Sequence, residues 1–173
     1  MGYWENTGAS DEWYTPRYVM DALDCHFDMD VASPRRATNV PCNVRLSEGS
    51  LDQEWKGFVW MNPPFGGRNG LVPWLKKFFA HGNGIALVPD RTSAPWFQEF
   101  ACKADCILFV SPKVKFERPD GTVGASPSNG TALLALSTKA IGALERASSL
   151  GFLARSEARR VGQRVGCWGA GER

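Results

Sequence analysis

Four consecutive residues, Asn62, Pro63, Pro64 and Phe65, place one amide, two rigid rings and one aromatic ring in a single turn. They follow the apolar run 58–61, which is typical of a strand covered on both faces. Because open α/β sheets bind ligands at the carboxyl ends of their strands, Asn62 falls where a ligand is expected. Two successive prolines each fix a φ angle, so the turn is stiff before a substrate arrives. The pattern predicts a rigid site for a flat molecule that bears an amine.

The chemistry that suits this turn is activation of an amine attached to an aromatic ring. Such a nitrogen is a poor nucleophile because its lone pair is delocalised into the ring. The side-chain oxygen of Asn62 and the carbonyl of Pro63 could accept from its two N–H groups and favour tetrahedral geometry, while Phe65 stacks on the ring. Positioning and preorganised electrostatics are enough for this, without a charged base. A plain proline turn that ends a strand would explain the same residues without chemistry.

The turn resembles the catalytic motif of amino-methyltransferases, which transfer a methyl group from S-adenosylmethionine to a planar nitrogen. Over about residues 13–136 the chain is similar to the phage-type Dam-like DNA N6-adenine methyltransferase family. Besides the turn, the resemblance is carried by Trp-Tyr-Thr-Pro at 13–16 and Asp-Met-Asp-Val-Ala-Ser at 28–33. It implies S-adenosylmethionine as cofactor, DNA as substrate, and an enzyme of the cytoplasm (that of the host cell if a phage encodes it).

The segment Trp13, Tyr14, Thr15 and Pro16 contains the first candidate cofactor residues. Thr15 followed by Pro16 predicts a helix start, with Thr15 as the N-cap and Pro16 at the first helical position. The resemblance implies that Trp13 or Tyr14 packs against the cofactor, and that Thr15 and the helix N-terminus face its carboxylate. A well-capped helix alone would give the same sequence.

A second group of candidate cofactor residues lies in the first expected strand, 26–31, and the turn after it. Asp30 falls near the end of this strand, where an acid could accept from the amino group of the cofactor, and Asp28 is the competing candidate. Ala32 belongs to the small turn that replaces a glycine-rich loop, a replacement that the resemblance shares.

A third candidate comes from the segment before Trp55. Family members often have Asp-Gly-Leu before a Trp here, whereas this chain has Gly-Ser-Leu at 49–51. The acid is therefore shifted to Glu48 or Asp52, and Asp52 is our candidate for contact with the adenosine of the cofactor.

Apolar and amphipathic segments alternate along the chain and predict an α/β fold. Further buried strands are expected at 84–88, 105–110 and 131–136, and helical spacing predicts helices over 71–79, ended by Gly82, and from Pro95. We expect a Rossmann-like methyltransferase sheet that is mostly parallel, with an antiparallel pair at one end and helices on both faces.

The expected organisation is a loose N-terminal segment, 1–12, a methyltransferase domain, 13–138, and a C-terminal helix with a basic tail, 139–173. The segment 34–56 is expected to be irregular. No separate target-recognition domain fits, so any sequence preference must come from loops.

The candidate DNA contacts are basic residues in two loops. Lys113, Lys115 and Arg118 belong to a segment rich in Gly, Pro and Ser, 113–130, within which 111–117 suits a hairpin arm, and Arg68 belongs to the glycine-rich loop after the catalytic turn. The formal net charge is only +2, which indicates no strong general attraction to nucleic acid.

Composition limits the other partners. The five cysteines are irregularly spaced and no CxxC occurs, which predicts reduced thiols and no metal site. No apolar run approaches the length of a membrane span, and no leader opens the chain, so we expect no membrane partner. The sequence does not indicate an oligomeric state.

Two other functions suit the same residues. The turn could hold the planar amide of a protein glutamine, which would make the chain a glutamine-amide methyltransferase. The missing glycine-rich turn and the shifted acid instead favour a degenerate, non-catalytic nucleic-acid-binding module.

Overall fold

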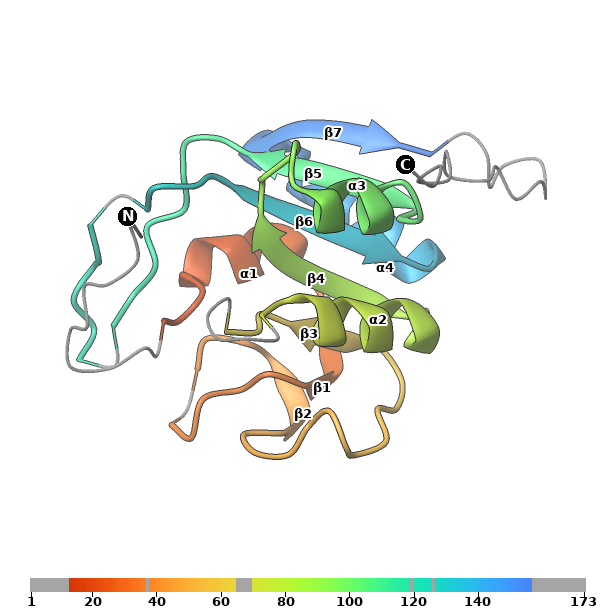
Figure 1. The fold of residues 1–173 in the computed structure, drawn as a ribbon. Helices are drawn as coiled ribbons and strands as arrows, with labels where there is room; N and C mark the ends of the chain where they lie inside the picture. Colours follow the sequence, from red (N-terminus) through yellow and green to blue (C-terminus); the bar gives the residue numbers. More distant parts are fainter. Residues whose placement is uncertain (1–12, 37, 65–69, 119, 126, 157–173) are drawn as a thin grey trace, which may run out of the picture.

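The computed structural model describes residues 13–36, 38–64, 70–118, 120–125 and 127–156, which form a mixed α/β fold (Figure 1). The helical segments are α1 (Arg17–Leu23), α2 (Val72–His81), α3 (Pro95–Ala101), α4 (Thr138–Arg146) and the 3-10 turn η1 (Ala147–Leu150). The strands are β1 (Phe27–Asp30), β2 (Cys42–Arg45), β3 (Val59–Met61), β4 (Gly84–Pro89), β5 (Cys106–Val110), β6 (Thr131–Leu136) and β7 (Gly151–Arg155).

The described strands form one seven-stranded sheet in the order β2-β1-β3-β4-β6-β5-β7. The first four strands are parallel, and the pairs β4–β6, β6–β5 and β5–β7 are antiparallel. The antiparallel part is therefore larger than the single pair expected. Since β5 runs in the same direction as β4, the carboxyl ends of β1 to β5 all lie at one edge, on the left in Figure 1.

The core consists of two clusters that share the sheet. One joins α1 and α4 to alternate strand residues such as Ile85 and Leu87, and the other joins α2 and α3 to the residues between them, Ala86 and Val88. Successive side chains of a strand point to opposite faces, so each cluster fills one side of the sheet. In Figure 1, α2 and α3 lie in front of the sheet and α1 and α4 behind it.

The sequence did not predict two edge strands. The segment 34–56 contains β2, and the C-terminal segment 139–173, expected to hold a helix and a basic tail, contains β7, which pairs with β5 along its whole length. Conversely, the expected hairpin arm at 111–117 makes no extended strand; Glu117 forms isolated bridges with Tyr14 and Val123. The sheet thus continues beyond residue 138, where we had expected the methyltransferase domain to end.

The remaining composition-based expectations concern thiols, metals and membranes. Cys25, Cys42 and Cys106 are free thiols, whereas Cys102 is disulfide-bonded, so reduced thiols are found at three of the four described cysteines. Among the described residues there is no group of three or more His, Cys, Asp or Glu side chains that could hold a metal ion. No helix in that part of the chain is long and apolar enough to cross a membrane.

Candidate active site

Asn62 lies directly after β3, at the carboxyl edge of the parallel strands, and its side chain is half-buried. Its Nδ2 donates a hydrogen bond to the Thr15 hydroxyl oxygen at 3.3 Å. Thr15 precedes α1 and is only 3% exposed. Pro63 is buried and Pro64 exposed. The structure therefore joins two segments that the sequence proposed separately for substrate and cofactor.

The direction of this hydrogen bond decides which atom of Asn62 faces a ligand. Nδ2 is used by Thr15, so Oδ1 is the atom with which the amide can accept from an incoming amine. Phe65 and Arg68, predicted to stack on the base and to contact DNA, lie outside the described residues.

The start of α1 differs from the prediction by one residue. Pro16, with φ −60° and ψ 148°, is the N-cap, the helix begins at Arg17, and no side chain caps it. The prediction that Thr15 caps the helix is wrong because Pro16 occupies the N-cap position, and the Thr15 hydroxyl accepts from Asn62. Thr15 instead holds the amide of the catalytic turn.

Asp30 is the last residue of β1 and is 2% exposed. Its Oδ1 accepts from the Ala32 N–H at 3.3 Å. Desolvation by burial raises the pKa of the Asp30 carboxyl to about 6, although hydrogen bonds from Ala32 and Ser33 and the charge of Arg45 act to lower it. In the register of the sheet Asp30 pairs with Trp60, two residues before Asn62, so the acid and the amide end adjacent strands.

Asp28, the competing acid, has a structural role. Its Oδ2 accepts from the Phe58 N–H at 2.6 Å and so helps to join β1 to the segment that leads into β3. Gly57 has a φ of +67°, and a Cβ at this position would overlap the Asp28 carboxylate. Of the two acids, only Asp30 lies at the strand end beside the catalytic turn.

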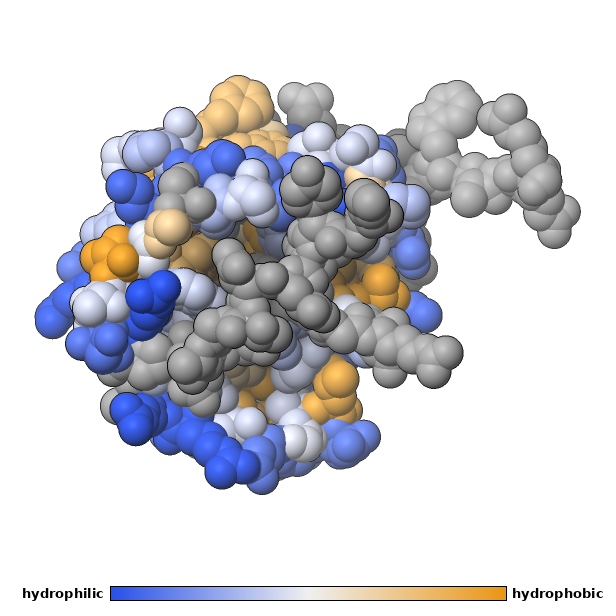
Figure 2. All heavy atoms as spheres, turned by 60° about the vertical axis from the view of Figure 1, so that its left-hand side comes forward, coloured by the Kyte–Doolittle hydropathy of each residue, from blue (hydrophilic) through white to orange (hydrophobic). Residues whose placement is uncertain are grey.

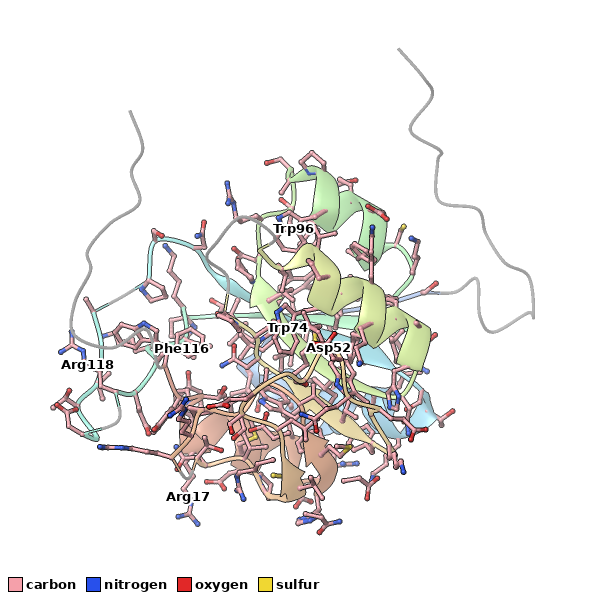
Figure 3. All side chains as sticks on the ribbon, turned by 60° about the horizontal axis from the view of Figure 1, so that its bottom comes forward. Arg17, Asp52, Trp74, Trp96, Phe116 and Arg118 are labelled. Carbon is pink, nitrogen blue, oxygen red and sulfur yellow. The ribbon has the colours of Figure 1, made fainter. Side chains whose placement is uncertain are left out.

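Asp52 lies on an exposed loop beside α2. The Lys77 ammonium donates to the carbonyls of Leu51, at 2.7 Å, and Gln53, and this ties the loop to the helix. Glu48 forms an ion pair with Arg35. Figure 3 shows Asp52 well separated from Arg118. Contact of Asp52 with the adenosine of the cofactor therefore stays a prediction.

The segment before α1 contacts a hairpin at 116–124, at the same edge of the sheet. The backbone of Tyr14 exchanges two hydrogen bonds with Glu117, at 2.9 and 3.0 Å, and Tyr14 is buried. Trp13 is 42% exposed and lies under the Arg118 guanidinium, 5.5 Å from the ring centroid. A Cβ on Gly124 would overlap the Trp13 ring. Trp13 thus packs on the hairpin, and contact of Trp13 or Tyr14 with the cofactor stays a prediction.

The 116–124 hairpin (Phe116 and Arg118 are labelled in Figure 3) is closed by hydrogen bonds from the Arg118 N–H to the Thr122 carbonyl and from the Gly124 N–H to the Phe116 carbonyl, each 2.8 Å. It belongs to the connection from the carboxyl end of β5 to the start of β6. Because β5 ends at the same edge as β3, this whole connection starts and finishes at the edge that carries Asn62.

The three predicted basic residues of this connection differ in their contacts. Lys115 and Arg118 are exposed, and Arg118 is held over Trp13. Lys113 is also exposed, but its ammonium donates to the carbonyls of Pro127, at 3.3 Å, and Ser128, at 2.9 Å. Lys113 therefore joins the start of this connection to residues 127 and 128 near its end, and it also contributes a positive charge.

A family model for DNA N-6-adenine-methyltransferase (Dam) matches residues 5–165 of the chain. The chain belongs to this family. The match spans every described helix and strand and includes Thr15, Asp30 and Asn62. No curated protein and no solved structure matches it.

The structure gives a role to a residue that the sequence did not single out. Asn39 donates from Nδ2 to the Thr15 carbonyl, at 3.2 Å, and to Glu117 Oε2, at 3.0 Å. It lies 24 residues from Thr15 and 78 from Glu117 in the chain. No local pattern identifies an asparagine in a polar loop as a bridge between two distant segments.

Figure 2 shows the face of the protein that carries the strand carboxyl ends. Hydrophilic residues predominate on its described surface, and hydrophobic residues appear as smaller patches between them.

Proposed function

We propose that this Dam-family protein transfers a methyl group from S-adenosylmethionine to the N6 amine of an adenine in DNA. The observation that carries the proposal is the hydrogen bond from Asn62 to Thr15. It fixes a neutral amide at the carboxyl edge of the sheet with its oxygen directed to accept.

The residues near Asn62 fit the cofactor chemically. S-adenosylmethionine bears a cationic sulfonium and an ammonium, and the buried carboxylate of Asp30 is the complementary group beside the turn. The small side chain of Ala32 and the hydroxyl of Thr15 complete a set of small and polar groups at the two adjoining segments. We expect Asp30 to hold the amino group or a ribose hydroxyl, with Tyr14, Thr15 and Ala32 around it. When bound, the cofactor supplies an electrophilic methyl group.

Asn62 and Pro63 act on the target nitrogen. The Asn62 oxygen and the Pro63 carbonyl accept from the two N6 hydrogens of a base flipped out of the duplex, and Phe65 stacks on its ring. Two neutral acceptors direct the nitrogen lone pair out of conjugation with the ring. The nitrogen gains the methyl group and then loses one proton, which passes to water because neither acceptor is basic.

The surrounding loops bind the DNA in this proposal. Lys115 and Arg118 are exposed on the connection between β5 and β6, and we expect them, together with Lys113 and Arg68, to contact phosphates. Phosphate contacts fix the position of the protein on the duplex and leave base recognition to groups nearer the turn.

The test offers DNA and protein together to the purified chain with methyl-tritiated S-adenosylmethionine. We expect label in DNA as N6-methyladenine, no transfer by Asn62→Ala, and cofactor binding by that variant, measured by calorimetry, within about threefold of the original. Asn43→Ala is the matched control, because Asn43 lies on edge strand β2 and bonds to His26. Label in protein glutamine would establish the other enzyme class. A chain that binds DNA but not the cofactor would be a non-catalytic module, and unchanged transfer by Asn62→Ala would refute the assigned role of the turn.

A further inference from the structure

We propose that Asn39 is a positioning residue for methyl transfer, which couples the 116–124 hairpin to the Asn62 amide. The inference rests on the proposed function and adds a residue, and a form of DNA-dependent control, to the same site.

The orientation of the Asn39 amide is determined by its partners. The Thr15 carbonyl and the Glu117 carboxylate are both acceptors, so only the NH2 end of the amide can lie between them. The two hydrogens of one nitrogen therefore serve two segments at once. Neither aspartate nor leucine, which are similar in size, could make both hydrogen bonds.

The contacts of Asn39 continue to the catalytic turn without a gap. Glu117 is joined to Tyr14 by the two backbone hydrogen bonds and to Asn39 by its carboxylate. Asn39 holds the Thr15 carbonyl, and the Thr15 hydroxyl holds Asn62. A hairpin, a loop, the start of a helix and the catalytic turn are thus connected by five hydrogen bonds.

At the 116–124 hairpin, this series of hydrogen bonds ends beside an exposed, charged residue, Arg118. Arg118 follows Glu117 directly and rests on Trp13, which is itself two residues from Thr15. A phosphate or base edge that binds Arg118 therefore acts on both strands of the Tyr14–Glu117 pair. Asn39 transmits the position of this pair to Thr15, and hence to the amide that must align with the target nitrogen. Misplacement by about 1 Å can cost about a hundredfold in rate, so a small shift is enough to control transfer.

If Asn39 had only a structural role, its hydrogen bonds would stabilise the loop without affecting the side-chain amide of Asn62. The first measurement therefore observes that amide directly. In the nitrogen–proton correlation spectrum of the whole chain, the side-chain NH2 signals of Asn62 are assigned by their loss in Asn62→Ala. We expect Asn39→Leu and Asn39→Asp to shift these signals toward the position of a solvent-exposed amide, and Asn43→Ala to leave them in place. Unmoved Asn62 signals in a folded Asn39→Asp protein would overturn the proposal.

The second measurement separates coupling from binding. Single-turnover transfer to DNA by Asn39→Asp should be at least tenfold slower than by the original chain, with KM for DNA and the affinity for S-adenosylmethionine within threefold. Glu117→Ala removes the carboxylate that Asn39 binds but keeps Asn39 and the backbone pair with Tyr14, so it should also slow transfer more than threefold and tests the coupling if an Asn39 variant fails to fold. A transfer rate of Asn39→Asp, or of Glu117→Ala, equal to that of the original chain would refute the coupling. Absence of transfer by the original chain would instead refute the proposed function, while the spectra would still test the positioning.

Discussion

The Asn62 amide nitrogen lies 3.3 Å from the Thr15 hydroxyl oxygen, although 47 residues separate the two in the chain. The hydroxyl could serve as donor or acceptor, and here it accepts. With its nitrogen directed to Thr15, the amide leaves its oxygen to accept from a ligand. Thr15 therefore helps to hold the side chain of the catalytic turn in position.

Replacement of Thr15 by valine should slow methyl transfer about tenfold, because one hydrogen bond of about 1 kcal/mol that orients the amide is lost. Valine keeps the shape of threonine, so the effect isolates the hydroxyl. Thr15→Ser, which keeps the hydroxyl, should lose less than threefold. Single-turnover rates on adenine-containing DNA make the comparison, and a Thr15→Val rate equal to that of the original chain would show that the hydroxyl does not orient Asn62.

Asp30 should make the protein less stable at neutral than at mildly acidic pH. Its folded-state pKa, about 6, is above the ordinary value of an aspartate, because burial disfavours the charged form. Folding therefore favours the protonated acid. The contribution of Asp30 to stability is greatest below the pKa of the unfolded chain and is lost as pH rises through about 6.

Asp30→Asn removes this dependence and should raise the free energy of unfolding at pH 7.5 by about 1–3 kcal/mol, since one pKa unit corresponds to about 1.4 kcal/mol. The gain should disappear toward pH 4. Urea unfolding at several pH values measures it, with Asp52→Asn as the control because Asp52 is exposed. The same replacement should weaken cofactor binding. If the variant is no more stable than the original at pH 7.5, other groups in the folded protein must stabilise the Asp30 carboxylate.

The elements with strong periodic patterns were predicted well. The apolar residues of α2 recur at helical spacing and the helix ends at Gly82, and the run Thr131–Leu136 is β6 residue for residue. Strand β2 was not found because it is short and largely exposed on the sheet edge, so no alternation marks it. Strand β7 was not found because its segment follows a polar helix and is covered only where it pairs with β5.

The candidate site shows the same division between local and tertiary signals. Asn62 and Asp30 could be predicted because each follows a recognisable buried strand, and strand ends meet at one edge of a sheet. The role of Asn39 could not be predicted, because it depends on two acceptors from distant segments. The contact of Trp13 with Arg118 could not be predicted for the same reason, because it joins segments that are about a hundred residues apart.

Lys115→Ala should weaken DNA binding to a similar extent for all sequences. Loss of one phosphate contact should reduce the slope of log affinity against log salt concentration by about 1. Lys113→Ala should change the slope as much only if its ammonium reaches phosphate as well as the two carbonyls of its own loop. Fluorescence anisotropy over a salt series compares the two variants. A slope unaltered in Lys115→Ala would remove this loop from the DNA-binding surface.

Gly57→Ala should reduce the free energy of unfolding by more than about 2 kcal/mol, because the left-handed φ strains an alanine by about 1–2 kcal/mol and its Cβ would overlap the Asp28 carboxylate. The carboxylate would have to leave the Phe58 N–H and loosen the junction of β1 and β3, the two strands that present Asp30 and Asn62. Gly142→Ala is the matched control. Gly142 lies within α4, its Cβ would meet only the Arg146 guanidinium, at 3.6 Å, and alanine should add about 0.5–1 kcal/mol there. Urea unfolding of both variants should therefore give shifts of opposite sign, and a Gly57→Ala protein as stable as the original would contradict the tight approach of residues 57 and 28.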